Sequence, residues 1–135
     1  MSGQSTIRCV RLWTGDDHHS HFEEGGILLG PGTRGDLFSG AFPTTKVSFR
    51  ETPSGGSMDW HTAPIRQLVI TLSGILDFEV QRGRHFQLLP GKVLLAEDTT
   101  GSGHAWKLVG SDPWRRIYVV LEPGVVLPFI PMKKP

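Results

Sequence analysis

The chain has 135 residues and a formal net charge of +1, a length that allows one hydrophobic core and is too short for two ordinary domains. Its charges form neither a basic stripe nor an acidic tail, so we expect no nucleic-acid partner and no anionic membrane partner. All apolar runs are far shorter than the ~20 residues needed to span a bilayer. Cys9 is the only cysteine, which excludes an internal disulfide, and no signal-peptide pattern opens the chain, so we expect a cytoplasmic protein.

Apolar residues recur along the chain with the period of two that β-strands require, and helical spacing is absent. The predicted strands span 7–13, 26–29, 45–50, 67–73, 75–80, 85–88, 93–96, 104–108 and 116–122. Turn residues separate them at the spacing of a sandwich or barrel. Glycine supplies the positive φ that hairpin turns need, so we predict hairpins at Ser73-Gly74 and at 81–84, and a loop over 30–40. The sequence therefore predicts an all-β fold.

The strand at 67–73 is apolar on both faces, whereas an antiparallel strand with one wet face would alternate. If Gln67 and every second residue after it point inward, then Leu68, Ile70 and Leu72 point outward and need a cover. Either a flap formed by the N-terminal strands of residues 1–50 or a second subunit would provide it, and we expect a homodimer. Residues 51–122 would form the core of a single domain spanning 1–135.

The apolar tail at 123–135 carries Pro128 and Pro131. These prolines exclude a central strand, because proline cannot donate to the ladder. We therefore expect the tail to dock on the surface of its own subunit or of a partner.

Two spaced patterns hold the main candidate site, namely His61-x-Ala63-x3-Gln67-x6-Gly74 and Gly101-x2-His104. They resemble the two signature motifs of the cupin superfamily, which read His-x-His-x3-4-Glu-x6-Gly and Pro-x-Gly-x2-His. In that family the four polar residues bind one metal ion inside a small β-barrel. The resemblance therefore implies a single cupin-type (jelly-roll) β-barrel, with a metal site at His61, Gln67 and His104.

Three positions depart from the family motifs: Ala63 replaces the second His, Gln67 replaces the Glu, and Thr99 replaces the Pro. Two neutral imidazoles can hold one divalent metal such as Fe, Mn, Ni or Zn, but Gln67 offers a carbonyl oxygen without charge. We expect weaker binding than at a full four-ligand site. The alternative is a metal-free cluster in which Gln67 and the two histidines are hydrogen-bonded core residues.

Further segments resemble one branch of small bacterial cupins of unknown function. They are 13–17, 20–24, 59–67 and 96–104, and the resemblance covers about residues 7–121. These motifs are specific for the branch and do not indicate a reaction.

A second cluster of ligand-type side chains occupies residues 16–24 and includes His18, His19 and His21. It lacks the i, i+4 spacing of a helical histidine pair. A solvated turn, in which Asp16 and Asp17 bond their own backbone, accounts for it. We predict that this run is not a metal site.

Trp60 directly precedes the motif histidine His61, and Trp106 lies two residues after His104. Both are therefore candidates for the wall of a ligand pocket. Arg66 or Arg115 would favour a carboxylate ligand if it reached that pocket. Core packing of the tryptophans and solvation of the arginines are the alternatives. Glu97 and Asp98, just before the second motif, are candidates for a general base or for caps of the following loop.

Three functions remain open from the sequence. By resemblance, the chain is a metal-dependent enzyme of oxygenase, isomerase or lyase type, with His61, Gln67 and His104 holding the ion. By the residues present, it is a non-catalytic barrel that binds or senses a small molecule without metal. The third possibility is an interaction protein that uses the barrel as a scaffold, because a fold does not fix a function.

Overall fold

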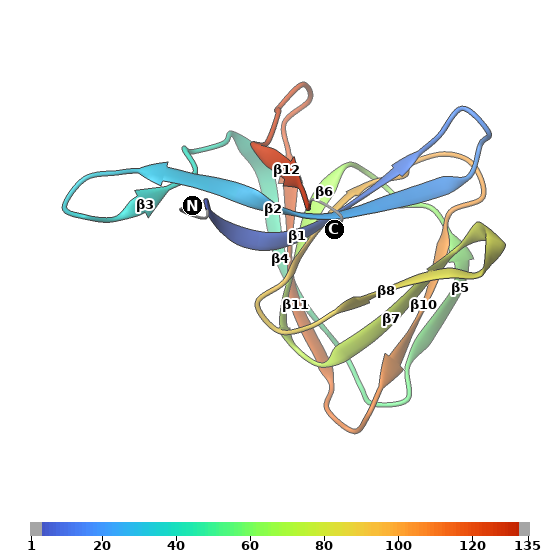
Figure 1. Cartoon of the computed structure of the whole chain (residues 1–135). Coiled ribbons are helices and arrows are strands. Elements are labelled where there is room, and N and C mark those ends of the chain that lie inside the picture. The colour runs from blue at the N-terminus through green and yellow to red at the C-terminus, as the bar shows by residue number, and fades with distance from the viewer. Residues whose placement is uncertain (1–3, 133–135) are drawn as a thin grey trace.

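The computed structural model describes residues 4–132 and consists of two β-sheets that face each other (Figure 1). The large sheet has the order β12-β2-β1-β9-β6-β11-β4, with β3 paired to β2, and the small sheet has the order β5-β10-β7-β8. The strands are β1 (Ser5–Thr14), β2 (Ser20–Pro31), β3 (Leu37–Phe38), β4 (Thr44–Thr52), β5 (Ser57–His61), β6 (Gln67–Ser73), β7 (Ile75–Val80), β8 (Arg84–Leu88), β9 (Val93–Glu97), β10 (His104–Val109), β11 (Trp114–Leu121) and β12 (Phe129–Pro131). The predicted all-β jelly-roll class is confirmed.

Several strands were not predicted or were predicted too short, among them β2, β3 and β5. β2 begins at Ser20 rather than at residue 26, because its polar first half is held by pairing with β1 and not by an apolar pattern. β5, which pairs with β10, was not predicted because it has only five residues, of which Met58 and Trp60 alone are apolar. The predicted loop at 30–40 contains β3, which pairs with the end of β2 in an arm that extends from the body of the molecule (Figure 1).

The predicted hairpin at Ser73-Gly74 is wrong, because β6 belongs to the large sheet and β7 to the small one. The chain crosses between the sheets at Gly74, whose φ is +93° and whose Cβ, if present, would lie 2.9 Å from the carbonyl oxygen of Pro113. The second predicted hairpin is confirmed, because β7 and β8 are antiparallel neighbours joined by the short 3-10 turn Gln81–Gly83.

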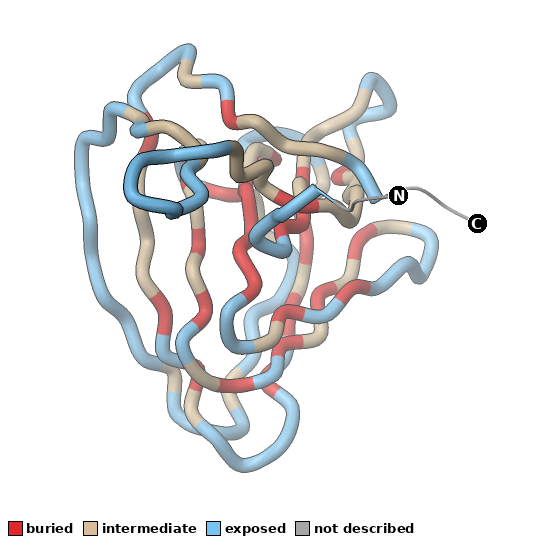
Figure 2. Tube along the Cα trace, turned by 60° about the vertical axis from the view of Figure 1, so that its left-hand side comes forward, coloured by how far each residue is buried: buried red, intermediate tan, exposed pale blue. Residues whose placement is uncertain are grey.

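Buried residues gather along the middle of the strands, and the loops at both ends are exposed (Figure 2). One core cluster fills the space between the sheets and includes Leu12, Phe78 and Trp114. A second cluster lies on the outer side of the large sheet around Cys9 and Leu127. The C-terminal tail therefore docks on its own subunit, and β12 pairs with β2 at the sheet edge, where its prolines are tolerated.

The alternation predicted for β6 is present. Gln67, Val69 and Thr71 are buried, whereas Leu68 and Ile70 are half-buried against the tail and Leu72 is 51% exposed. Association into a homodimer through this outer face stays a prediction.

Among residues 4–132 there is no helix long and apolar enough to cross a membrane.

Candidate ligand and metal site

The two motif histidines face each other across a pair of antiparallel strands. His61, at the end of β5, is the register partner of His104, at the start of β10. Their ring centroids are 4.4 Å apart with an interplanar angle of 59°. Backbone pairing between the two strands thus places residues that are distant in sequence side by side.

A β-bulge in β5 adjusts the side chains around this pair. His104 pairs with His61, but Trp106 pairs with Met58, so β5 carries one extra residue between the two pairs. Because of the extra residue, Met58 and His61 both line the cavity between the sheets although they are three positions apart. Bulges of this kind re-aim side chains near functional sites.

The Nδ1 atom of each imidazole has its own partner. His61 Nδ1 lies 2.8 Å from the carbonyl oxygen of Asp59, and His104 Nδ1 lies 2.6 Å from Asp98 Oδ2. Both partners accept hydrogen bonds, so each Nδ1 carries the proton and each Nε2 is left as the basic nitrogen. Burial, reinforced by the neighbouring His104, lowers the pKa of His61 below its ordinary value, although the bond to Asp59 opposes this shift. Burial thereby favours the neutral form of His61.

Asp98 is the centre of a buried polar network. It is 0% exposed, and its Oδ2 accepts bonds both from His104 Nδ1 and from Ser20 Oγ, the latter at 2.6 Å. Within residues 4–132, Asp98 Oδ1 is a buried oxygen without a hydrogen-bond partner. From the sequence, Asp98 was a candidate only for a base or a cap, because its position six residues before His104 does not indicate this contact.

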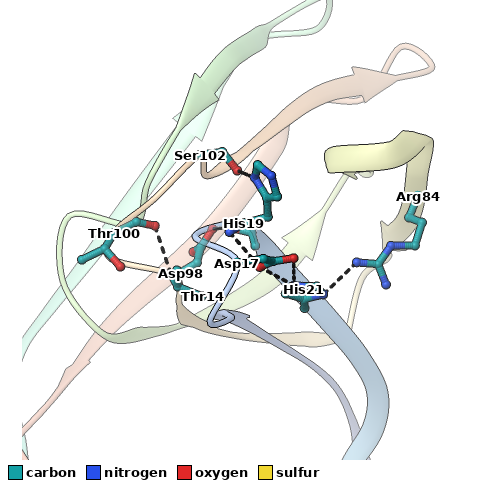
Figure 3. Close-up of polar contacts among 9 residues, drawn as sticks. Thr14, Asp17, His19, His21, Arg84, Asp98, Thr100 and Ser102 are labelled. Carbon is teal, nitrogen blue, oxygen red and sulfur yellow. Dashed lines mark hydrogen bonds and ion pairs between the residues drawn. The ribbon is translucent and has the colours of Figure 1, made fainter.

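The turn between β1 and β2 docks against the loop that carries the second motif (Figure 3). His19 Nδ1 lies 2.8 Å from Ser102 Oγ, and Ser102 N donates to the carbonyl oxygen of His18. His21 lies between Asp17, at 3.0 Å, and Arg84, also at 3.0 Å (Figure 3). The predicted exposed turn is present, and Asp17 Oδ1 accepts a bond from the backbone N–H of His19 at 3.0 Å, but His19 and His21 also fix the turn to the body of the protein.

Gly103 sets how closely the two histidine strands approach. Its φ is +74°, and a Cβ at this position would lie 2.0 Å from the carbonyl oxygen of His61. Any larger residue would have to move β5 away from β10, because that contact is with backbone. Glycine is required here by space as well as by backbone conformation.

The histidine pair opens on a cavity of about 610 Å³ between the sheets. Apolar and aromatic side chains form much of its wall, among them Val69, Phe78, Leu94, Trp106 and Trp114. Of the residues singled out from sequence, the cavity brings together His61, Gln67, His104 and Trp106.

Trp60 and Arg66 are not among the residues lining this cavity. Trp60, on the face of β5 opposite to His61, is 41% exposed. Arg66 donates through Nε to Glu97 at 2.7 Å, and Arg11 binds the other oxygen of the same carboxylate. The geometry places Arg66 in a surface ion pair and not beside the histidines.

A cationic wall on the opposite side of the cavity, formed by β4 and β11, was not predicted from the sequence. Arg116 is 3% exposed and lies over the ring of Trp114, with 3.8 Å between its Cζ and the ring centroid. Arg50, Lys46 and Tyr118 line the same side. The spacing of the charged residues along the two predicted strands could have indicated this wall, because a period of two places Lys46 and Arg50 on one face.

The side chains around the histidine pair meet only part of what a metal ion needs. Both histidines fit, because their Nδ1 atoms are anchored by outer partners as metal-ligating imidazoles usually are. Ala63 has no donor, and Gln67 offers only a neutral oxygen. Among residues 4–132, three or more His, Cys, Asp or Glu side chains do not gather into a group suited to a metal. The two histidines could therefore fill two ligand positions of a metal ion, and Gln67 could fill a third with an uncharged oxygen.

No family model and no curated protein matches this chain. Among solved structures, it is similar to a conserved protein of unknown function from Streptococcus pyogenes, with 18% identity, 58% of this chain and 65% of that chain covered, and a TM-score of 0.45. It is also similar to an uncharacterised protein with a double-stranded β-helix domain from Klebsiella pneumoniae. The identity is 16%, 81% of this chain and 85% of that chain are covered, and the TM-score is 0.46. A third similar structure is the cupin domain of Schizosaccharomyces pombe Cnp3. The identity is 13%, 89% of this chain and 86% of that chain are covered, and the TM-score is 0.47.

This chain spans slightly less than two thirds of the Streptococcus protein. The descriptions of the other two name the fold that the sequence motifs resemble. At such identities these likenesses concern the fold alone, so the function has to be argued from the cavity.

Proposed function

We propose that the protein binds a small organic molecule in the cavity between its sheets, beside His61 and His104. The observation that supports this most is the cavity itself, about 610 Å³ in volume and lined by aromatic side chains with a few polar groups. Small-molecule sites are concave, mostly apolar and of this size, with a small number of polar groups that fix orientation. Trp106 and Trp114 supply the flat apolar surfaces, and the two imidazoles supply the polar groups.

Filling the cavity tests this proposal. Ala96 is 3% exposed and lines the cavity, so Ala96→Phe should occlude it. Ala105, on β10 next to His104, is not among the lining residues, and Ala105→Phe is the matched control.

The measurement is the shift in melting temperature with a panel of fragments of six to twelve heavy atoms, since a ligand that binds only the native state must stabilise it. We expect the wild type and Ala105→Phe to respond to the same fragments and Ala96→Phe to respond to none. Equal responses from a folded Ala96→Phe protein, or no response from the wild type, would contradict binding in this cavity.

A second candidate is a weak site for one divalent metal, Fe, Mn, Ni or Zn, at His61, Gln67 and His104. The anchored Nδ1 atoms of the two histidines favour it. A bound metal would supply Lewis-acid chemistry to a ligand in the cavity, as an enzyme of oxygenase, isomerase or lyase type needs. Without it, the cavity is that of a binding or sensing protein.

Gln67→Glu separates the two candidates. A carboxylate beside a dication should raise metal affinity and so raise the melting temperature in the presence of metal. Without metal, the same change buries an unpaired carboxylate and should lower the melting temperature or raise the carboxyl pKa.

Gln87→Glu, at an exposed position on β8, controls for the added charge. If Gln67→Glu melts below the wild type and none of Mn, Fe, Ni or Zn restores it, the metal site is excluded.

A further inference from the structure

Strand β4 carries charged and polar side chains along the cavity. Lys46, Ser48 and Arg50 line it together with Val47, whereas the apolar Phe49 is 75% exposed and lies outside it. In a strand that only supports a core, the apolar residues would face inward. The polar residues of β4 therefore face an open cavity and not a packed core.

Arg116, on the neighbouring strand β11, is nearly completely buried in the same wall. Its Nε donates to Tyr118 Oη at 3.2 Å, and its Nη1 donates to Thr52 Oγ1 at 2.7 Å and to the carbonyl oxygen of Trp114 at 3.1 Å. All three acceptors are neutral. Burial lowers the pKa of Arg116, and the charge of Arg50 lowers it further. The bond to Tyr118 acts in the opposite direction.

Arg50 and Arg116 are direct register partners on β4 and β11. Their Cζ atoms lie 4.7 Å and 5.5 Å from the centroid of the same Tyr118 ring. Like charges directly opposite each other destabilise a sheet. Of the described residues that line the cavity, none is Asp or Glu, and Lys46 adds a third cation.

Several other cations of this chain have a carboxylate partner. Lys92, only 4% exposed, lies 2.9 Å from Glu24, and Arg11 and Arg66 share Glu97. Even Arg115, which is exposed on the outer face of β11, pairs with Glu51 at 2.7 Å. In the part of the chain that the structure describes, Arg116 and Arg50 form no such ion pair.

We propose that the missing anion is the carboxylate of the cavity's ligand, so that the protein binds a small organic acid. This inference rests on the proposed function and specifies its ligand. The acid group lies against Arg116 and Arg50, because a guanidinium binds the planar carboxylate in a bidentate manner. The apolar body of the ligand lies against Trp106 and Trp114, pointing toward His61 and His104.

Pairs of acids and their neutral amides test this directly: benzoate with benzamide, phenylacetate with phenylacetamide, and hexanoate with hexanamide. Affinity is measured by isothermal titration calorimetry and checked by the quenching of tryptophan fluorescence. We expect at least one acid to bind, and its amide to bind about tenfold more weakly or worse, the size that loss of a charge-assisted bond implies.

Arg116→Met should weaken acid binding by about tenfold or more and thereby reduce the preference for each acid over its amide. If Arg116→Met does not fold, Arg50→Met serves instead, because Arg50 is exposed and its loss leaves no cavity in the core. Arg115→Met is the matched control, since Arg115 is the next residue of β11 but points outward. It should bind every acid as the wild type does.

The outcomes separate this inference from the proposed function. Equal binding of acids and amides, unaffected by either arginine variant, would overturn the organic acid and leave the cavity as a ligand site. Inorganic phosphate or sulfate that binds as tightly as every acid would overturn a carboxylate as the group recognised. Absence of binding by all six compounds would overturn both proposals.

Discussion

Strands β9 and β4 belong to the same sheet but lie in opposite environments. In β9, all residues but the last are buried, and both faces are covered, by the inter-sheet core on one side and by the tail cluster on the other. In β4, all residues but the last are exposed, although the strand is longer. β9 lies near the middle of the sheet between β1 and β6, whereas β4 is at its end.

Within one sheet, the β9 side thus provides stability, and the β4 side contributes to the proposed binding site. Apolar burial on the β9 side provides the free energy of folding, since each buried aliphatic side chain contributes roughly 1.5–3 kcal/mol. The β4 side opposes folding by placing Arg50 opposite Arg116. Natural proteins tolerate such unfavourable arrangements where a function requires them. Substitutions on the two sides should therefore change different measurements.

The largest effect is expected at Asp98, which directly follows β9. Asp98→Ala leaves the Ser20 hydroxyl and the His104 Nδ1–H without their acceptor. Each orphaned buried group costs roughly 1–3 kcal/mol, so the free energy of unfolding should fall by about 2–6 kcal/mol in urea denaturation. Ser20→Ala removes one donor and should cost only about 1 kcal/mol. A loss for Asp98→Ala no larger than that of Ser20→Ala would show that the network is not cooperative.

A similar contrast is expected between two apolar positions. Leu12 is 0% exposed in the core between the sheets, and Leu12→Ala should lower the free energy of unfolding by about 2–5 kcal/mol. Phe49→Ala, on the outer face of β4, should change it by less than about 0.5 kcal/mol in the monomer. Comparable losses at both positions would mean that β4 is covered in solution.

A charge reversal on the β4 side should stabilise the protein. Arg50→Glu places a carboxylate opposite Arg116 and replaces repulsion by attraction, which is worth about 0.2–1 kcal/mol for a cross-strand pair. The same variant should lose the binding of every acid. Arg8→Glu, exposed on β1 opposite Gly26 and not among the residues lining the cavity, is the control for net charge. A less stable Arg50→Glu protein would refute unfavourable pairing at this site.

The outer face of β6 tests association with little effect on the fold. Leu72 is 51% exposed, so Leu72→Asp should alter monomer stability by less than about 0.5 kcal/mol. If the chain is a homodimer through this face, Leu72→Asp should shift sedimentation toward the monomer at micromolar concentration. Val126→Asp, in an exposed part of the tail, should leave sedimentation unchanged. A wild type that sediments as a monomer would rule out the homodimer.

The smallest effect is expected at Cys9 on β1. Burial raises the pKa of its thiol to about 12, so the thiolate that reacts with electrophiles is nearly absent at neutral pH. We expect no labelling of the native protein by a maleimide and full labelling in denaturant. Rapid labelling of the native protein would show that the β9 side opens readily.

The sequence predicted the strands whose apolar residues alternate or run together, such as β6, β7 and β9, because burial imposes those patterns. It did not predict β5 or the first half of β2, since cross-strand hydrogen bonds hold them whatever their side chains are. Gly74 was misassigned for a related reason. A glycine with positive φ serves a tight turn within one sheet and a crossover between two sheets equally well, and only the pairing of the flanking strands distinguishes them.

In the candidate site, the sequence identified the histidines from their motifs and Trp106 from its distance to one of them. It could not find the contact between Asp98 and His104, which depends on the fold of the loop between them. Arg116 was missed because a buried arginine in an alternating strand looks like a solvated one until its neighbours are known. Trp60 was overvalued because adjacency in sequence places a residue on the opposite face of a strand.

The pairing of His61 with His104 has a consequence for how the site can be inherited and detected. Two residues held opposite each other by strand register do not depend on how many residues separate them along the chain. Insertions in the exposed turn after β7 would lengthen that interval and leave the rings together, whereas a slip of β5 by one residue would replace His61 by a neighbour from the other face. A search for related sites that demands a fixed interval between the motifs would therefore overlook intact sites, and one that follows the strand partners would retain them.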